Sequence, residues 1–200
     1  MFLPPPPIEP SIIHAPCIAE WKNVWANTDY LIEEIEEEVK NSHNIYFQDA
    51  TISNGRINSH RTNSHLGVNV AATKNEFFRN LNNDYYLTLL AASEWYRNFY
   101  GITETFDHVE SYNLLRYQTG EEYKSHYDGG IADQRSISPI LYLNDDYEGG
   151  ELEFTNFGLK IKPEAGSLFI FPSNFPYSHI AHPVTNGTKY AIVTWLHEIN

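Results

Sequence analysis

The stretch His126-Tyr127-Asp128 decides how the fold and the chemistry of this sequence are interpreted. Its histidine and its carboxylate are two positions apart, so on a β-strand they share one face, because strand side chains alternate between faces. An imidazole nitrogen beside a carboxylate oxygen is a ligand pair that suits a first-row divalent metal. Such a pair also arises by chance, so a third ligand is needed before it predicts a metal site.

The segment that runs from His179 to Trp195 contains the third candidate ligand, His179 itself. Two histidines and one carboxylate form the facial triad of non-haem Fe(II) sites, which leaves three coordination positions open. His182 is a rival for the third position, although on a strand it would face the opposite side from His179.

Lys189 follows His179 by ten residues and is expected inside the last strand, among apolar neighbours. A buried ammonium group is unfavourable unless an anion pairs with it. No acidic residue is close to it in sequence, so the anion could be one end of a dicarboxylate that chelates the metal with its other end. Alternatively, Lys189 faces solvent at the edge of a sheet, and the spacing alone does not separate the two.

The composition excludes several classes of protein. A formal charge of −13, a pI of about 5.0 and the absence of a basic run argue against a nucleic-acid partner and favour a basic or neutral one. Cys17 is the only cysteine, so neither an intrachain disulfide nor a cysteine-based zinc site is possible. No apolar run is long enough for a membrane span, and the N-terminus does not resemble a signal peptide. We expect a soluble, intracellular (cytoplasmic) protein with no membrane partner.

The N-terminal part of the chain is expected to consist of an extended arm and a first helix. Residues 1–16 are rich in proline, which favours a polyproline-like arm strapped over the surface. A helix is predicted at 28–40, with Asn27 or Thr28 as its cap. One apolar stripe should bury it: Leu31, Ile32, Ile35 and Val39.

A second helix is predicted after a region of short strands. Residues 44–73 alternate loosely and contain the turn signal Asn54-Gly55. Helical spacing then predicts a helix over 83–100, ended by Gly101. The stripe expected to face the core consists of Leu87, Leu90, Ala91, Glu94, Trp95 and Phe99.

From Val109 onward the pattern changes to short strands joined by Gly, Pro, Asn and Asp turns. Strands are expected at 109–118, 122–128, 136–144, 150–155, 158–162, 167–172, 178–184 and 188–197. This spacing predicts a mainly β fold, a double-stranded β-helix (jelly roll) with the N-terminal helices packed on one face. The 200 residues form one domain, with an arm at 1–16, a helical support region at 17–108 and the jelly-roll core at 109–198.

Residues 57–198 resemble the 2-oxoglutarate- and Fe(II)-dependent dioxygenases of the prolyl 4-hydroxylase branch. Several fragments carry the resemblance, in the right order and at compatible spacing. They are 117–128 (YQTGEEYKSHYD), 141–144 (LYLN), 149–154 (GGELEF), 163–171 (PEAGSLFIF), His179 with Pro183-Val184, Gly187 and Lys189, and 194–198 (TWLHE).

The resemblance implies a cofactor, co-substrates and residues that hold them. The cofactor would be Fe(II), with 2-oxoglutarate and dioxygen as co-substrates and ascorbate as reductant. The interval of ten residues to Lys189 favours His179 over His182. The implied iron ligands are His126, Asp128 and His179, Lys189 would bind the distal carboxylate of 2-oxoglutarate, and Tyr117 and Tyr142 would line the same pocket.

The resemblance also implies a substrate, peptidyl proline, and therefore a prolyl 4-hydroxylase-like enzyme. The matching substrate contacts are Arg61, Glu110, Tyr123, Arg135, Trp195 and His197. Asn63 stands where the family's Arg-x-Ser stretch has serine, so that contact differs here. Tyr123 and Trp195 could instead be core residues, and Arg135 a turn residue.

Four alternative functions stay open at this point. The same chemistry could act on another amino-acid side chain or on a small molecule. A nucleic-acid demethylase is disfavoured because the chain is acidic and has no arginine after Arg135. A non-catalytic jelly-roll binding module would not need the complete ligand set. A metal-dependent hydrolase would not need 2-oxoglutarate.

Overall fold

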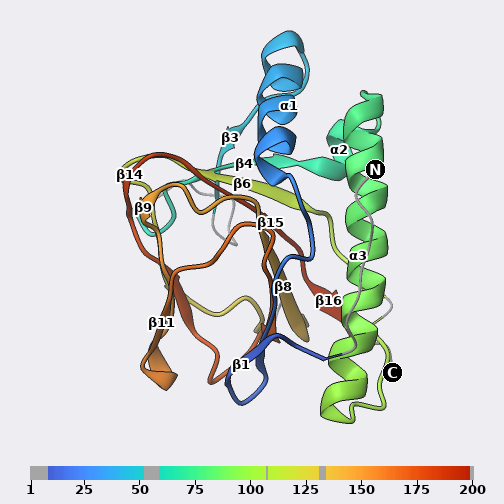
Figure 1. Ribbon diagram of the computed structural model, residues 1–200. Coiled ribbons are helices and arrows are strands. Elements are labelled where there is room, and N and C mark those ends of the chain that lie inside the picture. Colours follow the sequence, from blue (N-terminus) through green and yellow to red (C-terminus); the bar gives the residue numbers. More distant parts are fainter. Residues whose placement is uncertain (1–8, 52–58, 107, 131–133, 199–200) are drawn as a thin grey trace.

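The computed structural model describes residues 9–51, 59–106, 108–130 and 134–198. A ten-stranded sheet forms the middle of the molecule, with the three α-helices on one side and smaller sheets on the other (Figure 1). The helices are α1 (Thr28–Asn41), α2 (Val68–Ala72), α3 (Glu76–Tyr100) and the short 3-10 helix η1 (Thr155–Phe157). Among the described residues, no helix combines the length and the apolar character that crossing a membrane requires.

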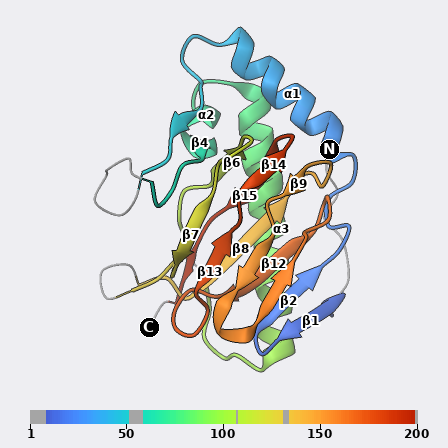
Figure 2. The same ribbon diagram turned by 90° about the vertical axis from the view of Figure 1, so that its left-hand side faces the viewer.

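The large sheet contains strands from both ends of the chain (Figure 2). In spatial order they are β1 (Ile12–Ala15), β2 (Ile18–Trp21), β12 (Leu168–Pro172), β8 (Ile137–Tyr142), β15 (Lys189–Val193), β6 (Asn113–Tyr117), β4 (Ser64–Gly67) and β3 (Gln48–Asp49). In addition, β16 (Leu196–His197) pairs with β8 and with β5 (His108–Val109).

Two smaller sheets complete the jelly roll, and all of their strand pairs are antiparallel. The four-stranded sheet has the order β11 (Leu159–Ile161), β10 (Leu152–Phe154), β13 (His179–Ala181) and β7 (Tyr123–His126). The two-stranded sheet pairs β14 (Val184–Asn186) with β9 (Glu148–Gly149).

The large sheet separates two hydrophobic cores. Successive residues of β6 show the division, because Leu114 packs with the helices whereas Leu115 packs between the sheets. The helical side includes Trp21 from β2 and Phe78 from α3. The mainly β fold with N-terminal helices on one face is therefore confirmed, and the space between the sheets is left to hold the site.

Most predicted elements are present. Helix α1 coincides with the helix predicted at 28–40, and Leu31 and Ile35 are buried on its predicted stripe. The strands expected from 109 onward are all found, although shorter than predicted. Asn54-Gly55 lies outside the described residues.

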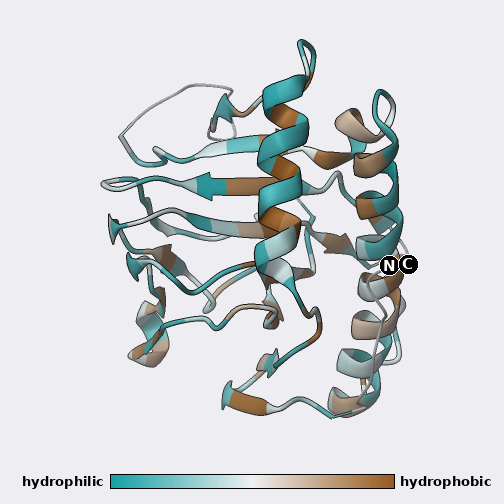
Figure 3. Cartoon of the chain, turned by 45° about the horizontal axis from the view of Figure 1, so that its top comes forward, coloured by the Kyte–Doolittle hydropathy of each residue, from teal (hydrophilic) through white to brown (hydrophobic). Residues whose placement is uncertain are grey.

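The predicted core stripe of α3 was wrong at most of its positions, although Trp95 does pack against the core. Leu87, Leu90 and Phe99 are exposed, whereas Phe78 and Tyr85 are buried. Apolar and polar segments alternate along the helix (Figure 3). The buried positions of the helix are Phe78, Leu81, Tyr85, Thr88, Leu89, Ala92, Ser93 and Tyr96. Both faces carry apolar side chains, and the buried face includes polar groups that find hydrogen-bond partners inside the protein. The helix also begins seven residues before the predicted start, because Asn75 caps it.

The expected organisation of the N-terminal half needs correction in two places. The described part of the 1–16 arm is not a free extended segment, since β1 pairs with β2 as a hairpin. Strand β2 in turn pairs with β12, and its apolar side chains are buried. The 17–108 region supplies strands to the large sheet as well as helices. Asn27 does occupy the N-cap of α1, but its backbone is left-handed (φ 56°) and its side chain makes no cap hydrogen bond.

We predict that the cap of α3 stabilises the fold measurably. The Asn75 side chain accepts a hydrogen bond from the Phe78 amide (3.2 Å) and donates one to Glu38 of α1 (2.7 Å). Asn75→Ala should lower the free energy of unfolding by about 1–2 kcal/mol in urea titration. Asn83→Ala, an identical change at an exposed position inside the helix, should leave it unchanged or slightly higher. Equal losses in both variants would contradict the capping role.

Candidate metal centre and adjoining pocket

Three candidate ligands meet where β7 lies beside β13. The register of this strand pair places His126 directly opposite His179. Asp128 follows β7 by two residues and lies under both imidazoles. One ligand atom from each of the three residues lies within 4.8 Å of the other two.

Hydrogen bonds to the backbone fix how the two imidazoles face the centre. Nδ1 of His126 lies 2.8 Å from the Lys124 carbonyl oxygen, and Nδ1 of His179 lies 3.2 Å from that of Tyr177. A carbonyl can only accept, so Nδ1 donates in both rings, and each Nε2 is left to face the centre. The two Nε2 atoms lie 3.5 and 3.7 Å from the oxygens of Asp128.

The protonation states also suit a cation. Burial, followed by the neighbouring His126, lowers the pKa of His179 to about 4, so its imidazole is neutral at pH 7. Burial alone would raise the pKa of Asp128, but the two imidazoles outweigh it and the net direction is downward. Its Oδ2 atom is buried and has no hydrogen-bond partner among the described residues. A neutral His179 imidazole and an ionised Asp128 carboxylate with a free oxygen, with the His126 ring beside them, fit a divalent metal such as Fe(II).

Aromatic rings surround this centre. The Tyr123 ring lies flat against the His126 imidazole, with centroids 3.5 Å apart and an interplanar angle of 11°. Phe154 and Phe171 pack against His179, with ring centroids 5.8 and 4.9 Å from it. These contacts hold the imidazoles in place and limit the access of water.

Lys189 lies buried in the same pocket, which overturns the alternative that it faces solvent. Its side chain is 2% exposed, and its ammonium donates a hydrogen bond to the Gly150 carbonyl (2.6 Å). Among the described residues, no carboxylate forms an ion pair with it. Burial, followed by the positive charge of Lys162, lowers the pKa of Lys189 to about 7. The ammonium therefore lacks the anionic partner that burial requires.

Three tyrosine rings surround the Lys189 ammonium. Their centroids lie 5.3 Å (Tyr117), 5.1 Å (Tyr142) and 5.8 Å (Tyr147) from Nζ. Burial raises the pKa of the Tyr117 and Tyr142 hydroxyls, so both stay neutral. Tyr147 and the Gly150 carbonyl were missed by the sequence analysis, because only the folded loop brings them to Lys189.

One pocket joins the candidate metal ligands to Lys189. Its walls combine the charged groups at its ends with apolar side chains between them. The residues that line it are Arg61, Leu115, Tyr117, Tyr123, His126, Asp128, Ile140, Tyr142, Leu152, His179, Ala181, Lys189, Ala191, Val193 and Trp195.

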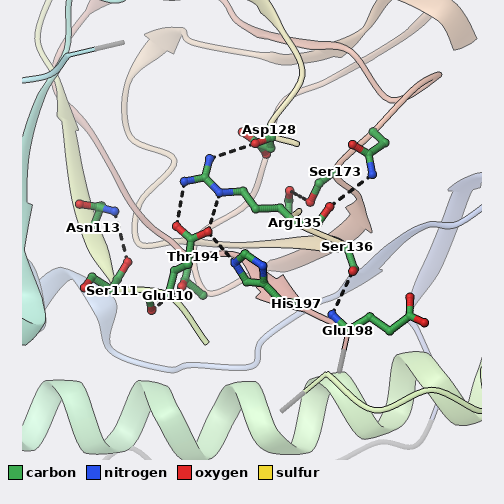
Figure 4. A network of polar contacts seen from close by, with 12 residues as sticks. Glu110, Ser111, Asn113, Asp128, Arg135, Ser136, Ser173, Thr194, His197 and Glu198 are labelled. Carbon is green, nitrogen blue, oxygen red and sulfur yellow. Dashed lines mark hydrogen bonds and ion pairs between the residues drawn. The ribbon is translucent and has the colours of Figure 1, made fainter. Parts of the chain in front are cut away.

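Three of the predicted substrate contacts, Glu110, Arg135 and His197, form one polar network beside the metal centre (Figure 4), and a fourth, Trp195, packs against it. Arg135 binds the Glu110 carboxylate with two hydrogen bonds (2.7 and 2.8 Å), and His197 binds it at 2.7 Å. The Arg135 guanidinium lies 3.6 Å from the ring centroid of Trp195 and donates to the Asp128 carbonyl (2.9 Å). Arg135 is therefore not a simple turn residue, because it connects this network to a candidate metal ligand.

The other two predicted contacts, Arg61 and Tyr123, lie side by side in the lining of the pocket. The Arg61 guanidinium lies 4.8 Å from the Tyr123 ring centroid, and the two residues form an isolated β-bridge. Asn63 is fully buried and accepts a hydrogen bond from Arg61 Nε (3.0 Å). Asn63, the residue that departs from the family pattern, thus orients the Arg61 side chain through this hydrogen bond.

The remaining candidate histidines lie outside the metal cluster. His182 binds Glu153 at 2.5 Å. His108 packs against His197, with ring centroids 5.1 Å apart. The structure therefore brings His179, and not His182, to His126 and Asp128.

Comparison with known proteins agrees with this geometry. The family model of the 2OG-Fe(II) oxygenase superfamily matches residues 112–197. Probable prolyl 4-hydroxylase 9 of Arabidopsis thaliana is 37% identical over 120 residues, which cover 46% of this chain and 42% of that protein. A putative prolyl 4-hydroxylase of Acanthamoeba polyphaga mimivirus is 31% identical over 113 residues, covering 46% and 47%. The match to each of these relatives covers less than half of the relative's own length.

Solved structures share the fold over nearly the whole chain. A prolyl hydroxylase from Trichoplax adhaerens, in complex with a hypoxia-inducible factor peptide fragment, has a TM-score of 0.72 at 17% identity, covering 91% of this chain and 84% of that one. A Pseudomonas putida prolyl-4-hydroxylase has a TM-score of 0.66 at 19% identity, covering 90% and 92%. At such identities the likeness shows the fold alone.

Residues 112–197 are thus similar to the 2OG-Fe(II) oxygenase superfamily. Within this superfamily, the sequence relatives are named as prolyl 4-hydroxylases.

We predict that His126, Asp128 and His179 hold the metal. Replacing any one of them with alanine should weaken Fe(II) binding by more than about 100-fold, because losing only an outer partner of a ligand costs roughly 10- to 100-fold. The measurement is an anaerobic Fe(II) titration, with circular dichroism to confirm folding. His182→Ala is the matched control and should bind iron like the parent protein. Loss of iron from that variant alone would contradict the assignment.

Proposed function

We propose that this protein is a 2-oxoglutarate- and Fe(II)-dependent dioxygenase that hydroxylates peptidyl proline. One observation carries the proposal: a His-Asp-His cluster and an unpaired, buried lysine share a single pocket. A metal-dependent hydrolase or a binding module would not require the lysine. The jelly-roll core proposed at 109–198 contains all four of these residues.

The residues at the two ends of the pocket have separate roles. His126, Asp128 and His179 would hold Fe(II) and leave three positions free. When bound, the iron and 2-oxoglutarate supply dioxygen activation, with 2-oxoglutarate converted to succinate and carbon dioxide as a C–H bond is hydroxylated; ascorbate is the expected reductant. Lys189 would bind the distal carboxylate of 2-oxoglutarate, which provides its missing anionic partner.

The walls of the pocket orient the co-substrate and keep it dry. Tyr117 and Tyr142 present neutral phenol groups beside the Lys189 ammonium. Apolar residues such as Leu115, Ile140 and Val193 line the stretch between the lysine and the metal ligands. Such walls suit a short carbon chain with a charge at each end, and they exclude water from the reacting centre.

The substrate would lie on the open side of the centre, between two arginines. The Glu110–Arg135–His197–Trp195 network forms one wall, and Arg61 with Tyr123 forms the other. The Trichoplax adhaerens prolyl hydroxylase was solved with a peptide fragment, which supports an extended peptide as the substrate here. Tyr123 and Trp195 add aromatic surface to the lining of the pocket, which suits the apolar ring of a proline. Other amino-acid side chains or small molecules are the alternative, and the intracellular location expected from the sequence stays a prediction.

The proposed function is tested by incubating the protein with Fe(II), ascorbate, 2-oxoglutarate and proline-rich peptides. Mass spectrometry should show the gain of one oxygen atom on proline, and no gain when 2-oxoglutarate is omitted. A control peptide with alanine in place of each proline should stay unmodified. Oxidation of the alanine peptide, or turnover without 2-oxoglutarate, would contradict the proposal.

We predict that Lys189→Met weakens 2-oxoglutarate binding by about 30- to 150-fold, since a charge-assisted hydrogen bond contributes about 2–3 kcal/mol. Methionine keeps the length of the side chain and removes its charge. Fe(II) binding should be nearly unchanged, because Lys189 is not a ligand. The measurement is an anaerobic titration of 2-oxoglutarate against the Fe(II) protein, followed through the metal-to-ligand charge-transfer band.

Lys189→Arg is the informative companion variant. Arginine keeps the charge but needs more room, so it should recover part of the affinity. If Lys189→Met had the midpoint of the parent protein, Lys189 would have no role in co-substrate binding.

We predict that Glu110→Gln acts on peptide binding and not on co-substrate binding. The change keeps the shape of the side chain but removes the charge that holds Arg135 and His197. The KM for the peptide should rise about tenfold, as expected when one charge-assisted interaction is lost. The affinity for 2-oxoglutarate, measured by calorimetry, should stay within about twofold of the parent value. A selective loss of 2-oxoglutarate affinity would contradict the assignment of Glu110 to peptide binding.

A further inference from the structure

We propose that Lys162, which lies outside the pocket, is a positioning residue for the co-substrate. It holds the loop from Tyr147 to Gly150 against Lys189 and adds a second positive charge beside the carboxylate subsite. This inference rests on the proposed function, because it concerns how the same pocket binds a dicarboxylate.

The loop from Tyr147 to Gly150 has a backbone that only glycine accommodates easily. Gly149 and Gly150 have φ values of 68° and 65°, in the left-handed region. A Cβ atom on Gly150 would lie 2.7 Å from the Tyr147 ring, and one on Gly149 would lie 2.4 Å from the Pro183 carbonyl. The loop is therefore packed closely between the Tyr147 ring and the strand that follows Pro183.

The ammonium of Lys162 binds this loop from the solvent side. It donates hydrogen bonds to the carbonyl oxygens of Tyr147 (2.6 Å) and Gly149 (3.1 Å). It also lies 3.1 Å from the centroid of the Tyr147 ring, which is almost fully buried. One exposed lysine thus fixes both the backbone and the ring of the loop.

The next carbonyl of the loop, that of Gly150, is bound by Lys189. It accepts the hydrogen bond from the buried Lys189 (2.6 Å). The carbonyls of three of the four residues from 147 to 150 are therefore bound by two lysines, with the Tyr147 ring near both ammonium groups. Because Gly149 and Gly150 are adjacent, Lys162 sets the position of the group that orients Lys189.

The charges around Lys189 support an electrostatic contribution from Lys162. The rings of Tyr117, Tyr142 and Tyr147 face Lys189, and burial keeps their hydroxyls neutral. Lys162 and Glu151 are the charged neighbours. Burial, and after it the repulsion by Lys162, lowers the pKa of Lys189 to about 7. An incoming carboxylate reverses this effect, because it is attracted by both positive charges.

Lys160 provides a matched control on the same segment. It lies two residues before Lys162 and is also exposed, but its ammonium pairs with Glu151 at 3.8 Å. A general effect of removing one surface charge should appear equally in Lys160→Met and Lys162→Met. An effect through the loop should appear only in Lys162→Met.

The test is calorimetry with two probes. 2-Oxoglutarate is titrated into the anaerobic Fe(II) protein, and glutarate, which lacks the chelating keto acid, into the metal-free protein. Lys162→Met should weaken both ligands by about tenfold, whereas Lys160→Met should change them by less than about twofold. Lys162→Arg keeps the charge and the donors and should stay within about threefold of the parent protein. The kcat at saturating 2-oxoglutarate should be unchanged in Lys162→Met, since that residue does not touch the reacting atoms.

Parent-like affinity of folded Lys162→Met for both probes would overturn the inference, and so would equal losses in Lys160→Met and Lys162→Met. Lys162→Gln repeats the test with a polar side chain if Lys162→Met fails to fold. Lys189→Met distinguishes a failure of the role proposed for Lys162 from a failure of the proposed function. If Lys189→Met loses affinity and Lys162→Met does not, only the role of Lys162 is wrong; if neither loses affinity, the proposed function itself is in error.

Discussion

The register between β7 and β13 is the constraint on which the site depends. It places His126 opposite His179 and leaves Asp128 beneath the two rings. A slip of one residue in either strand would turn one histidine to the other face of the sheet. The pairing of β10 with β13, which sets Phe154 opposite His179, fixes the same strand from its other edge. The metal centre is thus specified by strand pairing before any metal is bound.

The second requirement is a pocket that tolerates an unpaired cation. Lys189 lies on β15, the strand between β6 and β8, so Tyr117 and Tyr142 reach it from the two neighbouring strands. Their rings stabilise an ammonium without neutralising it. The Gly150 carbonyl completes the binding site for the ammonium and leaves its positive charge for an anion. Burial without a carboxylate partner costs stability, and it preserves a strong site for one end of a dicarboxylate.

Sequence reasoning predicted the jelly roll and the cluster because both depend on local patterns. Strands after Val109 alternate and end at turn residues, and that period related His126 to Asp128. The choice of His179 over His182 came instead from the family resemblance and the interval of ten residues to Lys189. The core face of α3 could not be predicted in this way. Tyr85 and Thr88 are buried because Tyr85 donates to the Ile192 carbonyl and Thr88 accepts from Trp25, contacts between distant segments. The same limit hid the Lys162 loop, since no spacing in the sequence brings Tyr147 and Gly150 to Lys189.

The proposed function requires that a single dioxygen molecule supplies one oxygen atom to 2-oxoglutarate and the other to the peptide substrate. It is tested most directly by turnover under ¹⁸O₂ with a proline-containing peptide, followed by mass spectrometry of both products. One labelled oxygen is expected in hydroxyproline and one in succinate, with the two products formed in equal amounts. Label in succinate with none in the peptide, or peptide oxygen that derives from water, would contradict it.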